Sequence, residues 1–542
     1  MDAFRSLFYT LDATTSSNKK IAALTEFFAN QPNLDIAWSV FFLTGRRLKQ
    51  HVSSHQMRLM FNDYLELPPW LLQECHSVVG DTAETVALLA SSKYLSNKVS
   101  TSTTGSLCDV IETLIKPFAE KDKEEKYQGL CEIWSRYSSA DIFLLNKFLT
   151  GGLRVGVSKK TVTKALALAF GQQESRIAHR LMGSWPVTAE FIDEMRHADR
   201  RNITDPAHPY PFCLANPLAS INTLPKLDDW LAEWKWDGIR AQLIKRADQV
   251  FLWTRGEDIV NHQFPEIVES ASCLPNGTVL DGELLVWSDN HPLAFHELQT
   301  RLGRKKPGPK LIKEKPCRLI AYDILELGGF DIRGKEMRQR RQLLEETIAK
   351  YPQIEISKVI PFETRSDLEV NWQNSRKNLA EGIMLKRKDA PYVTGRKQGC
   401  WWKWKVEPLT LDTVILYAEA GRGKRSNLCT SYTLAVWDSG SLVPIAKAYS
   451  GLSNDEITRL DRWIKKNTEE KFGPVRRLPP FQVLEIGFEG IAPSKRHKSG
   501  LALRFPRILR WREDKLAKEA DTVTTAREIL TKLSDNNEFK NS

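Results

Sequence analysis

Over the first 200 residues, apolar and polar positions alternate with the period of an α-helix. Apolar side chains recur three and four residues apart, for example in 21–28 and in 162–170, and this spacing places them on one face of a helix. A proline-rich stretch follows at 205–211. Because proline removes backbone donors and favours extended conformations, the stretch is typical of a linker. We therefore predict an all-α domain over residues 1–205.

The middle of the chain has the short apolar runs that are typical of β-strands. Such runs occur at 239–245, 250–254 and 278–287, with helical stretches between them. Strands that alternate with helices and turns in this way indicate a mixed domain with its own core. The pattern predicts an α+β domain over residues 206–405.

The C-terminal part again reads as strands, with one helix between them. The strand-like runs are 414–417, 432–437, 442–448 and 484–488. Ser453 and Glu456 have the spacing of a capping box, and the amphipathic stretch that they open runs to a stop signal at Gly473-Pro474. One helix inserted in a five-stranded β-barrel is typical of an OB-fold. We predict an OB-fold domain over residues 406–542, with a polar C-terminal tail from Asp535.

Composition and charge narrow the class of protein. A chain of 542 residues exceeds the roughly 250–300 residues that one hydrophobic core supports, so several domains are expected. The net charge of +11 favours a polyanionic partner, because lysine and arginine release counterions from phosphates; a basic protein without such a partner is the open alternative. The 8 cysteines form no Cys-x-x-Cys pair, which argues against a zinc site or a disulfide framework. No apolar run approaches the roughly 20 residues that span a bilayer, so we expect no membrane association and a cytoplasmic location.

The strongest chemical signal is the stretch 233–240, Glu-Trp-Lys-Trp-Asp-Gly-Ile-Arg. Lys235 stands at a strand end before a glycine turn, so its amine can point into a pocket. A lysine amine attacks phosphorus only when it is unprotonated, so its pKa must be lowered by neighbouring cations, a metal or desolvation. We expect Arg240 and basic residues further along the chain to do this. On its own, the motif also fits a surface lysine beside a hairpin turn.

Five further elements follow in order along the chain. They are Thr254-Arg255-Gly256, Asp281-Gly282-Glu283, Tyr322-Asp323, Glu381-Gly382-Ile383-Met384-Leu385-Lys386 and Trp401-Trp402-Lys403-Trp404-Lys405. From residue 233 to residue 405, this ordered set resembles the covalent nucleotidyltransferases, the superfamily of polynucleotide ligases and mRNA capping enzymes. The resemblance implies that Lys235 forms a phosphoramidate with AMP.

The same resemblance implies how the stretch holds ATP. Contacts to adenine are implied for Glu233 and Tyr322. Contacts to phosphate or ribose are implied for Arg240 and Arg255, and contacts to the α-phosphate for Lys386 and Lys403. Lys405 is implied in the same nucleotide site. Members of the superfamily often have an arginine six residues before Lys403, but here that position is Lys397 and Arg396 stands seven before. The nucleotide contact is therefore expected from Arg396, with Lys397 as the alternative.

Two carboxylates are candidates for a metal site. Mg²⁺ prefers oxygen ligands and usually takes one or two protein carboxylates together with substrate phosphates. Glu283 and Glu381 fit this pattern, and Glu283 has the alternative of binding the ribose. Taken singly, each also reads as a solvated acid at a strand end, and Asp281 and Asp323 read as turn residues or as supports for the site.

A basic stretch at 503–515, Leu-Arg-Phe-Pro-Arg-Ile-Leu-Arg-Trp-Arg-Glu-Asp-Lys, resembles the last motif of the superfamily, which belongs to the OB domain. The resemblance implies that Arg510, Arg512 and Lys515 orient the β- and γ-phosphates of ATP. Phosphoryl-type transfer depends mostly on positioning and charge neutralisation, so clustered cations suit this step. A solvated basic segment would explain the charges but not their place behind the other elements.

The stretch 149–160, Leu-Thr-Gly-Gly-Leu-Arg-Val-Gly-Val-Ser-Lys-Lys, resembles a loop in the DNA-binding domain of three-domain ATP-dependent DNA ligases. Its glycines let backbone amides approach phosphates, and its cations add charge at a helix start. The residues implied to bind DNA are Gly152, Arg154, Gly156 and Lys159. By its local sequence alone, the stretch also fits an ordinary interhelical turn.

Taken together, the resemblance is to ATP-dependent DNA ligases with the three-domain layout found in bacteria. It implies a monomeric enzyme that uses ATP and Mg²⁺ to seal nicks in duplex DNA during repair, replication and recombination, associated with the nucleoid through DNA. The cysteine pattern lacks the four-cysteine zinc module of NAD-dependent ligases. An RNA ligase or capping-type transferase, and a non-catalytic scaffold that binds nicks, are the alternatives.

Overall fold

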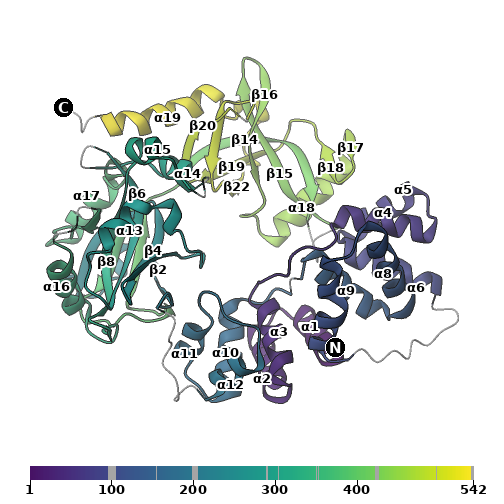
Figure 1. Ribbon diagram of the computed structural model, residues 1–542. Coiled ribbons are helices and arrows are strands. Elements are labelled where there is room, and N and C mark those ends of the chain that lie inside the picture. The colour runs from purple at the N-terminus through teal and green to yellow at the C-terminus, as the bar shows by residue number, and fades with distance from the viewer. Residues whose placement is uncertain are drawn as a thin grey trace. The chain divides into compact units, whose positions relative to one another are not determined.

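The structure is a computed structural model that describes residues 1–94, 105–153, 155–197, 206–288, 291–302, 304, 306–349, 351, 353–421, 427–495 and 497–538 (Figure 1). The chain divides into two compact units, described separately below. The first contains residues 1–177, 186–200 and 409–526, and the second contains residues 178–185, 201–408 and 527–542.

The N-terminal part of the first unit is helical, as predicted. Its helices are α1 (Asp2–Ala13), α2 (Ser17–Asn30), α3 (Asn33–Leu43), α4 (Ser54–Leu65), α5 (Pro69–Val79), α6 (Thr82–Tyr94), α7 (Leu107–Asp109), α8 (Lys123–Arg136), α9 (Ser139–Thr150), α10 (Lys159–Phe170), α11 (Glu174–Arg180) and α12 (Ala189–Arg196), with a π-helical segment at Val110–Ile115. Helix α2 packs along α10, and α6 packs along α9. Phe4, Phe42 and Phe148 form an aromatic core, in which the rings of Phe42 and Phe148 lie 4.7 Å apart.

The C-terminal part of the first unit is rich in strands. Its elements are β14 (Leu409–Ala420), β15 (Cys429–Asp438), β16 (Ser441–Ala448), α18 (Asn454–Lys466), β17 (Glu470–Phe472), β18 (Val475–Arg477), β19 (Val483–Phe488), β20 (Gly490–Pro493), β21 (Leu501–Arg504), β22 (Arg507–Trp511) and α19 (Val523–Glu538). The first half of β14 pairs with β19 and its second half with β18, while β19 also pairs with β22. These shared pairings, with bulges along β14, curl the sheet. The predicted strand-rich C-terminal domain with one inserted helix is confirmed.

Two details of this part differ from the prediction. The Ser453 capping box opens α18, but the helix ends at Lys466, and Gly473 instead turns the hairpin between β17 and β18 with a φ of +56°. Helix α19 extends to Glu538, into the stretch that was predicted to be a polar tail. Residues 539–542 lie outside the described chain.

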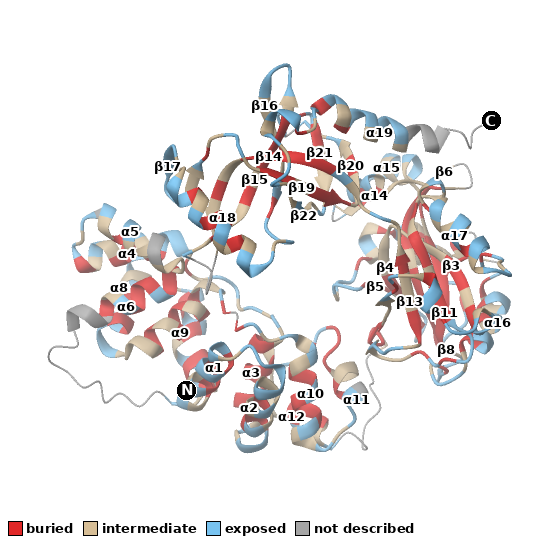
Figure 2. Ribbon diagram, turned by 180° about the vertical axis from the view of Figure 1, so that it is seen from behind, coloured by how far each residue is buried: buried red, intermediate tan, exposed pale blue. Residues whose placement is uncertain are grey.

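The strands described in the second unit form two large sheets that face each other and one small two-stranded sheet. These strands are β1 (Cys213–Leu214), β2 (Asn216–Pro217), β3 (Trp230–Trp236), β4 (Ile239–Arg246), β5 (Gln249–Thr254), β6 (Thr278–Ser288), β7 (His291–Pro292), β8 (Cys317–Leu327), β9 (Phe330–Asp331), β10 (Ile354–Ile356), β11 (Ala380–Arg387), β12 (Gly395–Arg396) and β13 (Trp401–Lys405). The larger sheet has the order β10-β8-β6-β4-β5, and the smaller has the order β2-β13-β11-β3. In Figure 2, buried residues run along these strands. This is the predicted α+β architecture.

Helices cover the outer faces of both sheets. They are α13 (Pro265–Ala271), α14 (Phe295–Leu302), α15 (Pro309–Glu314), α16 (Met337–Ile348) and α17 (Arg365–Gln373). Ile267, Leu298 and Leu344 from three of these helices join one core with the larger sheet, and Leu368 of α17 joins a second core with the smaller sheet. Because the outer faces are filled with apolar side chains, the polar residues of the strands are left to face the space between the sheets.

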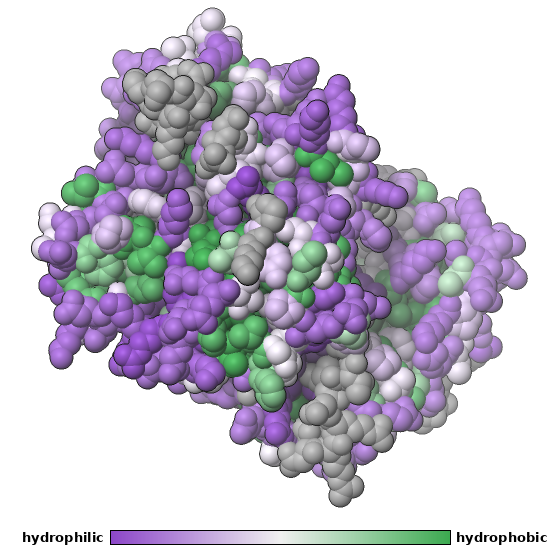
Figure 3. Space-filling view, turned by 60° about the vertical axis from the view of Figure 1, so that its left-hand side comes forward, coloured by the Kyte–Doolittle hydropathy of each residue, from purple (hydrophilic) through white to green (hydrophobic). Residues whose placement is uncertain are grey.

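The surface of the protein is largely hydrophilic in the view of Figure 3, with smaller hydrophobic patches. This agrees with the 27% share of charged residues. Within the residues that the structure describes, no helix combines the length and the apolar character that are needed to cross a bilayer.

Candidate functional site

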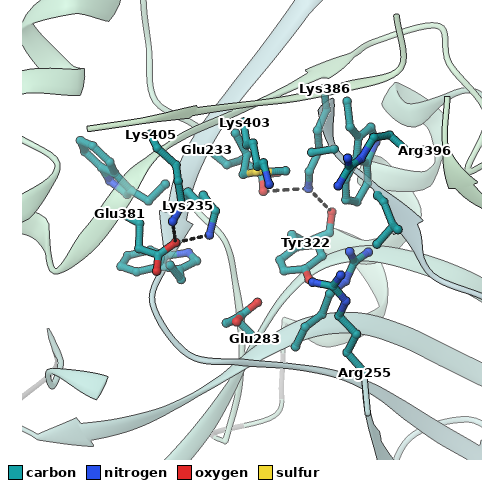
Figure 4. Close-up of a pocket in the computed structure, with 17 residues that line it drawn as sticks. Glu233, Lys235, Arg255, Glu283, Tyr322, Glu381, Lys386, Arg396, Lys403 and Lys405 are labelled. Atoms are coloured by element: carbon teal, nitrogen blue, oxygen red, sulfur yellow. Dashed lines mark hydrogen bonds and ion pairs between the residues drawn. The ribbon is translucent and has the colours of Figure 1, made fainter. Parts of the chain in front are cut away.

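A pocket of about 290 Å³ lies between the two sheets of the second unit (Figure 4). Eleven residues singled out in the sequence line it: Glu233, Lys235, Arg240, Arg255, Glu283, Tyr322, Glu381, Lys386, Arg396, Lys403 and Lys405. They come from both sheets and from the connections between strands. Motifs that are separated along the chain therefore contribute side chains to the lining of one cavity.

Lys235 ends its strand beside an acidic partner. Its Nζ donates to Glu381 Oε2 at 2.5 Å, and Lys405 Nζ lies 3.2 Å from the same oxygen. Burial lowers the pKa of Lys235, but the attraction of Glu381, with smaller contributions from Glu283 and Asp237, outweighs it and raises this pKa. The expected lowering by neighbouring cations is therefore wrong for this state, because Arg240 pairs elsewhere and a carboxylate occupies the position next to the amine. Burial raises the pKa of Glu381, but Lys235 and Lys405 outweigh burial and lower it to about 2.

Two glycines allow this arrangement. A Cβ on Gly238 would lie 2.3 Å from the carbonyl oxygen of Leu284, so only glycine lets the turn after Lys235 approach β6. Gly382 has a φ of +145°, and a Cβ there would lie 2.0 Å from the carbonyl oxygen of Trp404. It sits in the irregularity between Ala380 and Ile383, where β11 shifts its register against β3. The shift carries Glu381 toward Lys235.

Glu283 faces the pocket without a counterion. Its carboxylate has no hydrogen bond or ion pair with any described residue, and burial raises its pKa to about 8. A partly buried carboxylate in this condition is stabilised by a cation. Glu283 and Glu381 therefore fit a site for one hard divalent cation that takes its remaining ligands from phosphates and water. In the described part of the chain, no group of three or more His, Cys, Asp or Glu side chains is arranged to hold a metal.

Glu233 is a buried residue of the pocket lining and lies between two cations. Lys386 Nζ donates to Glu233 Oε2 at 2.9 Å and to the carbonyl oxygen of Tyr322 at 3.0 Å. Arg341 Nη1 donates to Glu233 Oε1 at 3.1 Å. Lys386, which was expected at the α-phosphate, lines the pocket with a side chain that is 1% exposed and is paired with Glu233. Arg341 was not predicted, since it lies on a helix outside every motif.

Arg240 is fixed by buried acceptors. Its guanidinium forms two hydrogen bonds with Asp281, at 3.1 and 2.6 Å, and a third with the carbonyl oxygen of Cys213 at 2.6 Å. Asp323 likewise holds Arg340 at 2.7 and 2.9 Å. Both aspartates are fully buried. Asp281 and Asp323 were interpreted either as turn residues or as supports for the site. The structure favours the second interpretation, since each holds an arginine side chain in place.

The remaining cations of the pocket come from β12, β13 and the turn after β5. Burial lowers the pKa of Lys403, and the nearby charges of Lys235 and Arg396 lower it further. Arg396 is on β12 and lines the pocket, whereas Lys397 is not among the lining residues. Arg255 is exposed in the turn after β5, and its backbone amide donates to the carbonyl oxygen of Arg240. These positions gather several positive charges around one pocket.

The basic motif near the C-terminus is held by acidic partners in the first unit. Arg512 Nη1 and Lys515 Nζ donate to Asp412 Oδ2 at 2.8 and 2.6 Å. Arg510 pairs with Glu485 at 2.9 Å. The three cations are therefore neutralised locally in this structure.

The glycine-rich loop of the helical part joins α9 to α10. Gly151 ends α9 with a φ of +64°, and Ser158 caps α10, which Lys159 begins. Gly156 has a φ of +62°, and its carbonyl oxygen accepts a hydrogen bond from Lys20 Nζ at 2.7 Å. Gly152 lies in the same loop, and Arg154 lies outside the described residues.

Comparison with known proteins agrees with this geometry. Three family models match in order: "DNA ligase N terminus" at residues 1–167, "ATP dependent DNA ligase domain" at 212–405 and "ATP dependent DNA ligase C terminal region" at 425–515. A DNA ligase of Methanococcoides burtonii is 30% identical over 77% of this chain and 76% of its own. The chain belongs to the ATP-dependent DNA ligases. A probable DNA ligase of Koribacter versatilis is 29% identical to this ligase and covers 95% of it, with 94% of its own length aligned.

Among solved structures, "Pmar-Lig_Pre." matches the ligase with a TM-score of 0.59 and 17% identity, over 94% of this chain and 99% of the other. This likeness supports the fold. As a member of its family, the ligase joins nicks in DNA at the expense of ATP, through an adenylate intermediate and with a divalent metal, typically Mg²⁺. The match of residues 1–167 to a DNA ligase model removes the capping-enzyme and RNA-ligase alternatives. Because members of this family catalyse the joining of nicks, the non-catalytic scaffold is excluded as well.

Proposed function

We propose that Lys235 is the residue of this DNA ligase that carries AMP. The observation that supports the proposal most is the position of its amine, which lines the pocket beside Glu381 and among the cations Lys403 and Lys405. In the first step, the unprotonated Nζ attacks the α-phosphorus of ATP. A nitrogen–phosphorus bond forms, the bond between the α-phosphorus and the bridging oxygen breaks, and pyrophosphate leaves.

The next two steps move AMP to DNA and release it. An oxygen of the 5′-phosphate at the nick attacks the lysyl adenylate and the nitrogen–phosphorus bond breaks. The nitrogen takes back the proton that it lost when that bond formed, so Lys235 regains its free amine. The 3′-hydroxyl then attacks the activated 5′-phosphate, loses its proton, and displaces AMP as the strand is joined. Dividing one hard condensation into steps through a covalent intermediate is the advantage of a nucleophilic side chain.

The other pocket residues are proposed to position the nucleotide. Glu233 and Tyr322 contact adenine, and Arg240 and Arg255 stand on the ribose and phosphate side. Lys403, Lys405 and Arg396 neutralise phosphate charge. A Mg²⁺ ion held by Glu283 and Glu381 would stabilise negative charge on the phosphates. Preorganised cations in a partly buried site are worth more than the same charges in water.

Roles outside the pocket are proposed as well. Arg510, Arg512 and Lys515 orient the β- and γ-phosphates in the first step, and Gly152, Arg154, Gly156 and Lys159 contact the backbone of nicked duplex DNA. The domain limits 1–205, 206–405 and 406–542 fit this division of labour. We further propose that the ligase acts as a monomer in the cytoplasm, associated with the nucleoid through DNA, in repair, replication and recombination.

The test of the central proposal is covalent labelling. The protein is incubated with α-labelled ATP and Mg²⁺, denatured, and examined for retained label, with Lys235→Arg as the variant. Arginine keeps a cation beside Glu381 but is not a nucleophile, so we expect label on the wild type and none on the variant. Lys397→Ala, which changes a neighbouring lysine that does not line the pocket, should label normally. Label on Lys235→Arg equal to the wild type would refute the assignment.

A further inference from the structure

A buried cluster in the wall of the pocket joins three elements of the second unit. Glu233 is on β3, Lys386 is on the neighbouring strand β11, and Arg341 is on helix α16. All three are buried: Glu233 and Lys386 are each 1% exposed and Arg341 is 7% exposed. Each carboxylate oxygen of Glu233 has its own cation, Lys386 on Oε2 and Arg341 on Oε1.

Both cations are themselves anchored. Arg341 Nη1 also donates to the carbonyl oxygen of Ser357 at 2.8 Å, and its Nε donates to Glu345 at 2.6 Å. Lys386 is tied to β8 through the carbonyl oxygen of Tyr322. Because both of its oxygens are held by anchored donors, the carboxylate of Glu233 is restricted in rotation. Each oxygen accepts at most about two hydrogen bonds, which leaves capacity for a ligand in the pocket.

We propose that Arg341 is a positioning residue that, together with Lys386, keeps Glu233 as an oriented anion and thereby makes the ligase select ATP over GTP. The inference rests on the proposed function, in which Glu233 contacts the base. Arg341 touches neither the nucleotide nor the pocket, and it acts only through Glu233.

The chemistry of the two purines gives the selectivity. Adenine carries an amino group at C6, which donates hydrogen bonds, whereas guanine carries a carbonyl oxygen there, which only accepts them. An ionised carboxylate is an acceptor only, so it pairs with the amino group and opposes the carbonyl oxygen.

Arg341 fixes one oxygen of this carboxylate. A buried carboxylate is costly unless it is paired. Without the guanidinium of Arg341, Lys386 alone would balance the charge of Glu233. Glu345, the other ion-pair partner of Arg341, is itself an anion and cannot replace the lost positive charge. Removal of the guanidinium thus leaves Oε1 of Glu233 without its anchored donor and frees the carboxylate to rotate, so that it binds adenine more weakly and rejects guanine less.

The experiment measures covalent labelling of Lys235 in the full-length protein with α-labelled ATP and, separately, α-labelled GTP, over a range of nucleotide concentrations. The variants are Arg341→Met, which keeps bulk without charge, and Arg341→Lys, which keeps charge but cannot reach Glu233 and Glu345 together. The control is Arg318→Met. Arg318 is in the same unit, is paired with Glu355 and does not line the pocket. Thermal unfolding is recorded for every variant.

For Arg341→Met, we expect the half-saturating ATP concentration to rise by about tenfold, the size of one charge-assisted hydrogen bond. The maximum labelling rate should change far less, and the preference for ATP over GTP should narrow by about tenfold. Arg341→Lys should give values between those of the wild type and Arg341→Met. Arg318→Met should match the wild type in both the half-saturating concentration and the preference for ATP.

Two outcomes would overturn the inference. In one, folded Arg341→Met has the same half-saturating ATP concentration and the same preference for ATP over GTP as the wild type. In the other, Arg341→Met weakens labelling by ATP and labelling by GTP to the same extent. If Arg341→Met does not fold, Arg341→Lys decides, since an altered preference supports the role and a wild-type preference refutes it. Failure of the proposed function is a separate result, because the wild type would then carry no label at Lys235.

Discussion

Lys235 Nζ and Glu381 Oε2 are 2.5 Å apart, so the proposed nucleophile and a proposed metal ligand form an ion pair with each other. The pair raises the pKa of Lys235 and lowers that of Glu381. The amine is therefore protonated at neutral pH, and it must lose both its proton and its partner before it can attack. A cation that competes for Glu381 would weaken this pair.

The first prediction concerns the pH dependence of lysyl adenylate formation. Because a raised pKa keeps Lys235 charged, the labelling rate of the wild type should increase with pH, by up to about tenfold per pH unit while the unprotonated fraction is small. Glu381→Gln removes the main carboxylate that raises the pKa, so its profile should shift to lower pH, with a lower maximum because a metal ligand is lost. The measurement is the labelling rate against pH at saturating ATP and Mg²⁺. A profile that stays in place or moves to higher pH would contradict the prediction, and Glu369→Gln on α17 serves as an unshifted control.

The eleven predicted pocket residues were found from sequence because the ordered motifs that resemble the covalent nucleotidyltransferases mark their positions, which the structure places within strands, at strand ends or in turns. Arg341 was missed because it meets Glu233 only through tertiary packing, from a helix 108 residues away. The burial of Lys386 was missed for the same reason. The sequence predicted that α18 ends at Gly473, but the helix ends at Lys466. Gly473 lies in the turn of the β17–β18 hairpin, and the sequence alone does not distinguish such a turn from the end of a helix. The partner of Lys235 was also not foreseen, since the glycine irregularity that delivers Glu381 exists only in the paired sheet.

The second prediction separates two neighbouring cations. Arg396 lines the pocket and Lys397 does not. Arg396→Ala should therefore raise the half-saturating ATP concentration for labelling by about tenfold, as expected for the loss of one charge-assisted contact. Lys397→Ala is the matched control and should stay within about twofold of the wild type. The reverse order of effects would assign the nucleotide contact to Lys397.

The third prediction concerns acid stability. Burial, then the nearby His208 and Arg333, lower the pKa of His179 from its ordinary 6.5 to about 2, and its ring stacks on Tyr210 at 5.1 Å. The unfolded chain therefore takes up a proton below about pH 6.5 that the folded chain does not, so the stability that depends on a neutral His179 is present above that pH and is lost as the pH falls. Over 1.5 pH units the loss amounts to at most about 2 kcal/mol.

The variant His179→Phe keeps an aromatic ring but cannot be protonated. Calorimetric unfolding at pH 6.5 and 5.0 should show a smaller loss of stability for this variant than for the wild type. His197→Phe changes an exposed histidine that is 63% accessible, so its acid sensitivity should equal that of the wild type. Equal acid sensitivity of His179→Phe and the wild type would show that the buried imidazole is not responsible.

The last prediction concerns the glycine that delivers Glu381. Gly382 has a φ of +145°, and an added Cβ would lie 2.0 Å from the carbonyl oxygen of Trp404, so β11 and β13 must separate to admit any side chain. Gly382→Ala should therefore lower the free energy of unfolding by about 3 kcal/mol or more and remove lysyl adenylate formation, because the shift that aligns Glu381 with Lys235 is lost. Gly334→Ala is the control: its Cβ meets nothing within 4 Å and its φ is not positive, so its stability should be unchanged or slightly higher. Thermal unfolding and ATP labelling are measured on both variants. Normal labelling by a folded Gly382→Ala protein would show that the position of Glu381 does not depend on this glycine.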